Sequence, residues 1–418
     1  MIRSAAPGSD EPLLDGLTVI DFTRVLAGPY ATRMLADLGA RVIKIERPGE
    51  GDEIRHTVLQ LDPSRTDQSS YFARLNAGKK SIAIDLAHPQ ARKIALDLVR
   101  RADVVVENFS PGVMARYGLD DAALRALRPD LVYCSISGFG QSGPLSSMQA
   151  YAHLINAISG MMDLDRGSDP QPRVAYLQAA DVLAGAHAFG AICAALVRRG
   201  RNGRGAYLDI SMLECLVAAD DITYGSILNG GKVQREPRIG MVVQRIGGRY
   251  LAMQSAGAPH LWSRLTALIG HPELATDARF STPMARRANW PDLLNILRGW
   301  LSGFDSVDQA VATLSAARIP AVPMLSPEEV IEHPQLAARD AFPEIEHPGR
   351  GRIRITGLPF HVDHNPVAPG GPAPYRVGEH TQAILGELGY DAERIRALQA
   401  QRVVEIPEAA AQTASTAP

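Results

Sequence analysis

One carboxylate, Asp181, stands in the small and apolar stretch QAADVLAGAHAFG, residues 178–190, with no Lys or Arg beside it. Aspartate is a common N-cap residue, and the Ala-rich run after Asp181 predicts a helix that begins there. Backbone N–H groups and the helix dipole keep such a carboxylate ionised even in apolar surroundings. An ionised carboxylate can act as a nucleophile toward an activated acyl group. The capping and nucleophilic interpretations of Asp181 are compatible, and both stay open at this point.

Three basic residues near the ends of expected strands could hold an anion. Arg47 follows RVIKIE, Lys79 follows RLNAG, and Arg116 follows VENFSPGVMA. Guanidinium and ammonium groups are the usual donors to phosphate. On its own segment Arg47 is also compatible with a solvated surface residue. Taken together, the three residues suggest a site for a polyphosphate.

The composition argues against several classes of partner. The chain has 418 residues, of which 46% are hydrophobic, and a formal net charge of −2. It has no basic run, no apolar leader and no run approaching about 18 apolar residues, so we expect no nucleic-acid partner, no membrane partner and a cytoplasmic location. The three cysteines lack CxxC spacing and are expected to be reduced core residues. The eleven histidines are scattered, so no metal site is expected.

The first half of the chain alternates strand and helix patterns. LTVIDF predicts a strand, residues 29–38 predict a helix closed by Gly39, and RVIKIE predicts a second strand. Similar units follow as far as LVYCSISGFG, whereas residues 151–199 have a helical pattern. This alternation indicates a parallel sheet with helices on its faces. The expected fold class is α/β, with a Rossmann-like parallel-sheet large domain and a smaller α+β domain.

The large domain is expected to be discontinuous, because strand and helix patterns resume after a segment of different character. The expected limits are a flexible tail at 1–12, the first part of the large domain at 13–225, the small domain at 226–334, a return segment that completes the large domain at 335–403, and a second flexible tail at 404–418.

The first strand-helix-strand unit invites comparison with NAD-binding proteins, in which an acid such as Glu46 holds a ribose. Its loop, FTRVLAGP, lacks the GxGxxG pattern and offers only Gly28 for a close backbone approach. The loop therefore argues against an NAD site.

Read in order, these segments resemble the class III CoA-transferases, the superfamily of formyl-CoA and carnitine CoA-transferases that also includes α-methylacyl-CoA racemases. The resemblance runs nearly end to end. It rests on LLDGLTVIDFTRVLAGPYATRMLADLGARVIKIERPGEGD, FARLNAGKKSIAIDL, ADVVVENFSPGVMARYGLD, LVYCSISGFGQSGP, AADVLAG, GRGAYLDISMLE and YRVGEHTQAIL. The resemblance implies the family's fold, an interlocked homodimer in which two ring-like chains pass through each other.

The resemblance also implies that coenzyme A lies across the large domain. By motif position the contacts fall on Val25, Arg47, Asn76, Lys79, Asn108, Phe109 and Arg116. An adenine and several phosphates require an apolar or aromatic face together with Arg or Lys donors, and this set contains both. No metal is implied.

The family's catalytic aspartate corresponds to Asp181, which is followed by Gly185. The implied reaction is transfer of CoA from an acyl-CoA to a carboxylic acid, through an aspartyl anhydride and an aspartyl-CoA thioester. The identity of the acyl donor and acceptor is not contained in these motifs.

Racemases of the superfamily instead remove and return an α-proton, using a histidine and an aspartate. Tyr151 stands where the racemase histidine would fall, Ala152 where its following acid would fall, and His153 lies two positions away. Tyrosine is usual there in the transferases, so the resemblance favours transfer, with Tyr151 and His153 as candidates for the substrate pocket. A racemase that uses His153 as a relocated base and a non-catalytic CoA-binding protein are the alternatives.

Overall fold

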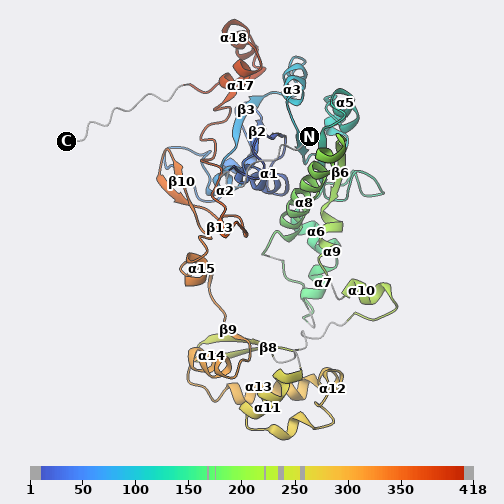
Figure 1. The fold of residues 1–418 in the computed structure, drawn as a ribbon, viewed down its shortest axis with the longest axis vertical. Helices are drawn as coiled ribbons and strands as arrows, with labels where there is room; N and C mark the ends of the chain where they lie inside the picture. The colour runs from blue at the N-terminus through green and yellow to red at the C-terminus, as the bar shows by residue number, and fades with distance from the viewer. Residues whose placement is uncertain are drawn as a thin grey trace, which may run out of the picture. The chain divides into compact units, whose positions relative to one another are not determined.

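The computed structural model describes residues 11–166, 169–174, 176–220, 223–233, 240–254 and 259–408 (Figure 1). The chain divides into two compact units. Unit 1 comprises residues 1–166, 171–233 and 337–418, and unit 2 comprises residues 167–170 and 234–336. The domain limits expected at 225/226 and 334/335 stay predictions. Residues 1–10 and 409–418, which make up most of the two expected tails, lie outside the described residues.

Unit 1 is built on a seven-stranded sheet with the strand order β14-β3-β2-β1-β4-β5-β6. Its strands are β1 (Thr18–Asp21), β2 (Arg41–Glu46), β3 (Lys80–Ile84), β4 (Val104–Glu107), β5 (Val132–Ser137), β6 (Ala206–Ser211) and β14 (Val404–Glu405). Strands β1 to β6 are parallel, which confirms the expected α/β class. The strand order reverses between β1 and β4, and at such a switch point the loops beyond the strands' carboxyl ends diverge and leave room for a ligand.

Helices cover both faces of this sheet, as the alternating pattern predicts. The described helices of this unit are α1 (Ala27–Asp37), α2 (Ser70–Asn76), α3 (Ala91–Val99), α4 (Val113–Arg116), α5 (Asp121–Leu127), α6 (Ala152–Ile158), α7 (Met161–Asp165), α8 (Ala179–Asn202), α9 (Met212–Ala218), α10 (Thr223–Leu228), α17 (Thr381–Glu387) and α18 (Ala392–Ala400), with a 3-10 turn, η1 (Glu53–His56).

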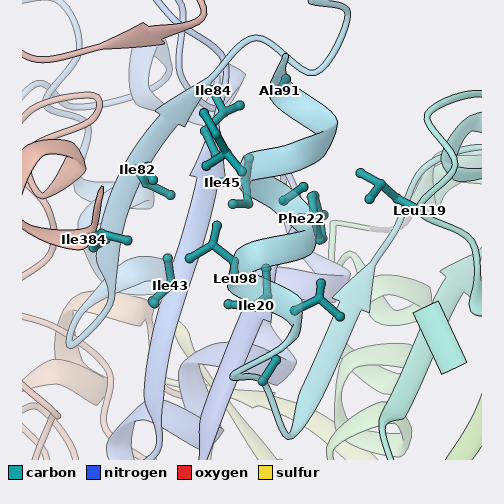
Figure 2. Close-up of a cluster of buried hydrophobic side chains, with 14 of the residues drawn as sticks. Ile20, Phe22, Ile43, Ile45, Ile82, Ile84, Ala91, Leu98, Leu119 and Ile384 are labelled. Carbon is teal, nitrogen blue, oxygen red and sulfur yellow. The ribbon is translucent and has the colours of Figure 1, made fainter. Parts of the chain in front are cut away.

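The two faces of the sheet have separate hydrophobic cores because side chains alternate along each strand. On one face Ile20 and Ile43 pack with Leu98 of α3 and Ile384 of α17 (Figure 2). On the other face the neighbouring strand residues, Val19 among them, pack with α1, α6, α8 and α9. Both cores are continuous, so the strands are held rigidly and their carboxyl ends form a fixed edge.

Helix α8 combines length with apolar composition, and by these two properties alone it could cross a membrane. The expectation that no run of about 18 apolar residues exists holds for consecutive residues, because Asp181 and His187 interrupt the stretch, and a count of consecutive residues therefore does not detect this helix. A core helix passes the same test, and α8 packs against α1, α6, α9, β5 and β6.

Unit 2 combines a three-stranded antiparallel sheet with a layer of helices. The strands are β7 (Met241–Ile246), β8 (Arg249–Gln254) and β9 (Ala321–Pro323). The helical elements are α11 (Pro259–Leu268), η2 (Pro272–Ala275), α12 (Pro283–Ala288), α13 (Trp290–Leu301), α14 (Val307–Ala316), α15 (Pro327–Ile331) and α16 (Pro334–Ala337), which reaches the boundary of the unit. Leu251 and Met253 of β8 are fully buried in a core that includes Trp262 and Leu293.

The return segment contains the hairpin β10 (Glu344–His347) and β11 (Gly351–Arg354), followed by β12 (His361–Val362) and β13 (Asn365–Pro366). It is bonded to β3, since Ala83 N donates to Thr381 Oγ1 over 3.0 Å. Beyond α18, β14 pairs antiparallel with β3, and Val404 is buried. The second tail was expected to begin at residue 404, and at this strand the expectation is wrong, because two residues are too few to show a strand pattern.

Candidate active site

The loop between β1 and α1, residues 22–26, lies against the segment that follows β4, at the switch point of the sheet. Asn108 Oδ1 accepts a hydrogen bond from Arg24 N, and Asn108 Nδ2 donates to Arg24 O, each over 2.8 Å. The Arg24 guanidinium lies 5.2 Å from the centre of the Phe109 ring. Val25 has a φ of +66°, a left-handed conformation that is unusual for a β-branched residue. The structure thus brings together three residues of the predicted CoA site: Val25, Asn108 and Phe109.

Glu107, at the end of β4, fixes the backbone of this segment from below. Its Oε2 accepts a hydrogen bond from Phe109 N over 2.8 Å. Burial raises the pKa of Glu107 to about 7, while Ser135 and the Phe109 N–H oppose the shift. A buried carboxyl group therefore supports the segment that carries Asn108 and Phe109.

Asp181 lies in the first turn of α8 and faces the first loop. The N-cap of α8 is Gln178, so Asp181 is the third helical residue and the expected N-cap position is wrong by three residues. Its carboxylate lies near the Ala27 N–H, the backbone group that does most to lower its pKa. Burial raises the pKa of Asp181 to about 6, whereas the Ala27 N–H and His153 lower it. At pH 7 roughly nine in ten such groups are ionised, so a desolvated nucleophile is available.

Gly185 allows α8 to approach α1 closely enough for this contact. A Cβ atom at Gly185 would lie 2.6 Å from Ala27 O and 3.0 Å from Tyr30 Cδ1, which leaves no room for a side chain. Val182, next to Asp181, packs with Leu26 of the first loop. The glycine one turn after Asp181 therefore brings its carboxylate within reach of Ala27.

Tyr71 and Gln178 also belong to the surroundings of Asp181, and sequence reasoning did not identify either. The Tyr71 hydroxyl donates to Gln178 Oε1 over 3.1 Å. Burial and the charge of Asp181 raise the pKa of Tyr71 to about 12, so its phenol stays protonated. The two residues are 107 positions apart, and no local pattern would have linked them.

Lys79 and Asn76 lie beneath the site rather than at its surface. Their residues are 2% and 0% exposed. Lys79 Nζ is within hydrogen-bond distance of Asp21 Oδ2 (3.0 Å), Thr32 Oγ1 (2.8 Å) and Asn76 Oδ1 (2.9 Å). These partners occupy both side chains within the protein. The structure therefore assigns them a supporting position, and the prediction that their side chains bind CoA has no support in it.

Arg47 and Arg116 are exposed, as groups that meet a soluble anion would be, but neither is bonded to the Arg24–Asn108 pair. Arg47 Nη1 forms an ion pair with Glu50 over 3.1 Å, and both side chains are more than 60% exposed. Arg116 ends α4. On α6, Tyr151 is the exposed N-cap residue and His153 is exposed. The carboxylate of Asp181 interacts electrostatically with His153.

In the ranges that the structure describes, no three or more His, Cys, Asp or Glu side chains form a group that could hold a metal ion. The three cysteines are free thiols, with Cys134 and Cys215 buried and Cys193 partly buried.

The family model, the relatives in sequence and the similar solved structures all point to the same family. The model of the family described as CoA-transferase family III matches residues 14–381. The chain is 34% identical to the succinate–glutarate CoA-transferase of Agrobacterium fabrum, covering 90% of this chain and 96% of that protein. It is 36% identical to the acetyl-CoA:oxalate CoA-transferase of Acetobacter aceti, covering 86% and 92%. A CAIB/BAIF family protein from Brucella suis has a similar structure, with a TM-score of 0.76, 32% identity, and coverage of 90% of this chain and 100% of that one.

Proposed function

Because the chain belongs to CoA-transferase family III, we propose that it is an acyl-CoA:carboxylate CoA-transferase with Asp181 as its nucleophile. The observation that carries the proposal is the close approach of α8 to α1 at Gly185, which puts the Asp181 carboxylate near enough to the Ala27 N–H for this N–H to lower its pKa. It places a desolvated carboxylate beside the loop at the switch point of the sheet, where a nucleotide-like ligand is expected.

The proposed reaction has four balanced steps. A carboxylate oxygen of Asp181 attacks the thioester carbonyl of the donor, the C–S bond breaks, and a mixed anhydride and CoA thiolate form. The thiolate attacks the aspartyl carbonyl of the anhydride and releases the donor acid as a carboxylate. The acceptor carboxylate then attacks the aspartyl-CoA thioester, giving a new anhydride and the thiolate. Attack of the thiolate on the acceptor carbonyl yields the new acyl-CoA and regenerates Asp181, with no net proton taken up.

The groups around Asp181 suit this chemistry. Each addition places negative charge on an oxygen, and a preorganised N–H or O–H donor stabilises that charge. The Ala27 N–H is such a donor beside Asp181, whereas the single O–H of Tyr71 is already donated to Gln178 Oε1. The apolar contacts of Val182 and Leu26 help to exclude water, which would hydrolyse the anhydride.

Coenzyme A is proposed to lie at the switch point, with Val25, Asn108 and Phe109 along its path. The exposed guanidinium groups of Arg47 and Arg116 are available to its phosphates. Lys79 and Asn76 would contribute through the loop that they support and not through their side chains.

A homodimer is proposed for the assembled enzyme, and the interlocked form follows from the resemblance alone. Leu154 and Ile158, one turn apart on α6, are 50% and 48% exposed. Tyr176 and Leu177, which precede α8, are also exposed. So many large apolar side chains near the proposed site favour burial against a second copy. A cytoplasmic location is part of the same proposal.

Trapping of the covalent intermediate tests the proposal directly. The protein is incubated with succinyl-, acetyl- or formyl-CoA, and the peptide that contains Asp181 is analysed by mass spectrometry after treatment with hydroxylamine or borohydride. Modification of Asp181 that requires the acyl-CoA is expected. The same donors are paired with glutarate, oxalate and monocarboxylates to identify the acceptor. Binding of CoA with no modification and no exchange would favour a non-catalytic CoA-binding protein.

A racemase is the second candidate, because His153 interacts electrostatically with Asp181 and the two could act as paired bases. Incubation of a 2-methylacyl-CoA in deuterated water distinguishes this reaction from transfer. A racemase would incorporate deuterium at the α-carbon and lose that activity in His153→Gln, whereas a transferase would show neither effect.

A further inference from the structure

Two buried ion pairs lie directly beneath the first loop. Lys79 Nζ is 3.0 Å from Asp21 Oδ2, and Lys44 Nζ is 2.9 Å from Asp52 Oδ2. All four side chains have 0% exposure. Isolated charges would be very unfavourable at such positions, so each pair depends on its own internal partners.

The same four side chains hold the backbone of the loop and of the first turn of α1, where Pro29 lies. Lys44 Nζ donates to Thr23 O over 2.7 Å, and Lys79 Nζ donates to Pro29 O over 3.2 Å. Asp21 Oδ1 accepts from Thr23 N over 2.9 Å, and Asp52 Oδ1 accepts from Val25 N over 3.2 Å. The bonded positions lie on both sides of Ala27, whose N–H contacts Asp181. The left-handed conformation of Val25 is unfavourable by about 1–3 kcal/mol and requires such support.

We propose that Lys79 is a positioning residue for Asp181: its ammonium group, with Asp21, holds the loop so that the Ala27 N–H stays directed at the carboxylate. This inference rests on the proposed role of Asp181 as nucleophile. Lys79 has no direct contact with reacting atoms and acts only through the loop. Its influence should therefore show in the properties of Asp181.

The role of Lys79 requires its proton. The four oxygen atoms around Nζ belong to Asp21, Pro29, Thr32 and Asn76, and a neutral amine has only two N–H groups for them. Burial lowers the pKa of Lys79 to about 8, with Asp21 and Asp52 opposing and Lys44 adding to the shift. Two other charged groups interact electrostatically with these lysines. Asp37, which is paired with Arg33 on α1, interacts with Lys79, and Glu46 interacts with Lys44.

Loss of this proton affects activity and stability in opposite directions. The pKa of Lys79 in the folded protein lies below its ordinary value, so from about pH 8 to 10.5 the unfolded chain binds more protons. The contribution of Lys79 to the free energy of unfolding therefore rises with pH in this window. A decline in activity above pH 8 would then result from loss of the support that Lys79 gives to the loop, and not from unfolding of the protein.

The test compares Lys79→Met with Arg55→Met as a matched control. Arg55 is an equally buried cation, but it pairs with Glu46 over 2.7 Å and donates to Pro374 O in the return segment instead of the first loop. Thr32→Val is a milder variant that keeps the shape and removes the hydroxyl 2.8 Å from Lys79 Nζ. If Lys79→Met does not fold, the measurements on Thr32→Val decide whether Lys79 positions Asp181.

The first measurement is the pH dependence of carbodiimide labelling at Asp181, which needs no turnover because a protonated carboxyl group adds directly to the reagent. Loss of the Ala27 N–H bond is expected to raise the labelling midpoint by about 0.5–1 pH unit in Lys79→Met and by less in Thr32→Val. Arg55→Met should retain the wild-type midpoint. An unchanged midpoint in both test variants, or an equal shift in Arg55→Met, would overturn the proposal.

The second measurement is the single-turnover rate of Asp181 acylation by acyl-CoA. Misplacement of the donor should slow this rate roughly tenfold to a hundredfold in Lys79→Met. In the wild type the rate should fall above about pH 8, and in Thr32→Val the fall should begin at lower pH. A wild-type protein that is never acylated would refute the proposed function, while the labelling midpoints would still decide whether Lys79 positions Asp181.

Discussion

Asp21 and Asp181 both act at the connection between β1 and α1 and differ in almost every other respect. Asp21 is fully buried and accepts a hydrogen bond from Thr23 N, whereas Asp181 is partly buried and lies near the Ala27 N–H, which lowers its pKa. Burial alone would raise both pKa values. The pKa of Asp21 is nevertheless about 2, and that of Asp181 is about 6.

The partners of each carboxylate explain the difference. Asp21 is surrounded by Lys79, Lys44 and the hydroxyl groups of Thr23 and Thr32, which together outweigh the effect of burial. Asp181 has backbone N–H groups and a more distant histidine. A carboxylate whose charge is neutralised by cations is a poor nucleophile and a good anchor, whereas one held by N–H groups alone keeps its reactivity. The more deeply buried carboxylate has the lower pKa, so the neighbouring cations, and not the degree of burial, separate the two roles.

The largest effect is expected from Asp181→Ala. Removal of the nucleophile should lower CoA-exchange turnover by about 10⁴-fold or more, because no other group can form the anhydride. The free energy of unfolding should change by less than about 1 kcal/mol, because no buried cation loses its partner. CoA exchange and urea denaturation of the same preparation measure the two quantities. Turnover within tenfold of the wild type would mean that Asp181 is not the nucleophile.

Asp21→Asn should produce the converse result, a large effect on stability. The substitution keeps the shape of the side chain and leaves Lys79 and Lys44 with a positive charge in excess, so we expect the free energy of unfolding to fall by about 3–5 kcal/mol. Urea denaturation at pH 7 measures the loss. Asp181→Asn is the matched control and should be close to neutral. Equal losses in the two variants would contradict the assigned roles.

Gly185→Ala tests the contact between α8 and α1. The added Cβ would lie 2.6 Å from Ala27 O, so α8 must move away, and we expect a loss of about 1–3 kcal/mol together with slower acylation of Asp181. Gly190→Ala is a control on the same helix, since a Cβ there meets nothing within 4 Å. It should increase stability by about 0.5–1 kcal/mol, because alanine is the better helix former. Similar effects at both glycines would show that the close approach is unimportant.

Much of the fold could be predicted because its signals are local. The apolar runs of β1, β2, β4 and β5, separated by helical patterns, indicate a parallel sheet without reference to distant residues. The two-residue β14 carries no such pattern and depends on its pairing with β3. The start of α8 was misplaced because Ala179 and Ala180 are strong helix formers, and they extend the helix ahead of Asp181.

The candidate site was less predictable because its contacts join distant parts of the chain. Lys79 after a glycine has the sequence character of a surface residue, and its partner Asp21 is 58 positions away. The resemblance pointed to Asp181, whose catalytic role stays a prediction, but no sequence pattern distinguishes an acid that contacts N–H groups from one that contacts buried lysines. That distinction follows only from three-dimensional proximity.

The smallest effects concern pH. Turnover should rise through about pH 6 as Asp181 ionises. Because the pKa of Asp181 is raised, the folded protein binds more protons than the unfolded chain between about pH 4 and 6. The contribution of Asp181 to the free energy of unfolding therefore falls as pH rises through this window. The lowered pKa of Asp21 has the opposite sign, since its contribution is present above about pH 4 and is lost as pH falls toward 2.

His153→Gln should shift the acidic limb of turnover upward by a few tenths of a pH unit, because it removes the electrostatic interaction with His153 that lowers the pKa of Asp181. Exposure of His153 to solvent screens the interaction, so high salt should produce a similar shift in the wild type and almost none in the variant. Turnover of the wild type and of the variant, each measured from pH 5 to 8 at low and at high salt, gives the four pH profiles. A shift larger than one pH unit, or loss of turnover at every pH, would show that His153 takes part in the reaction. Asp181 and His153 would then be a pair of catalytic bases.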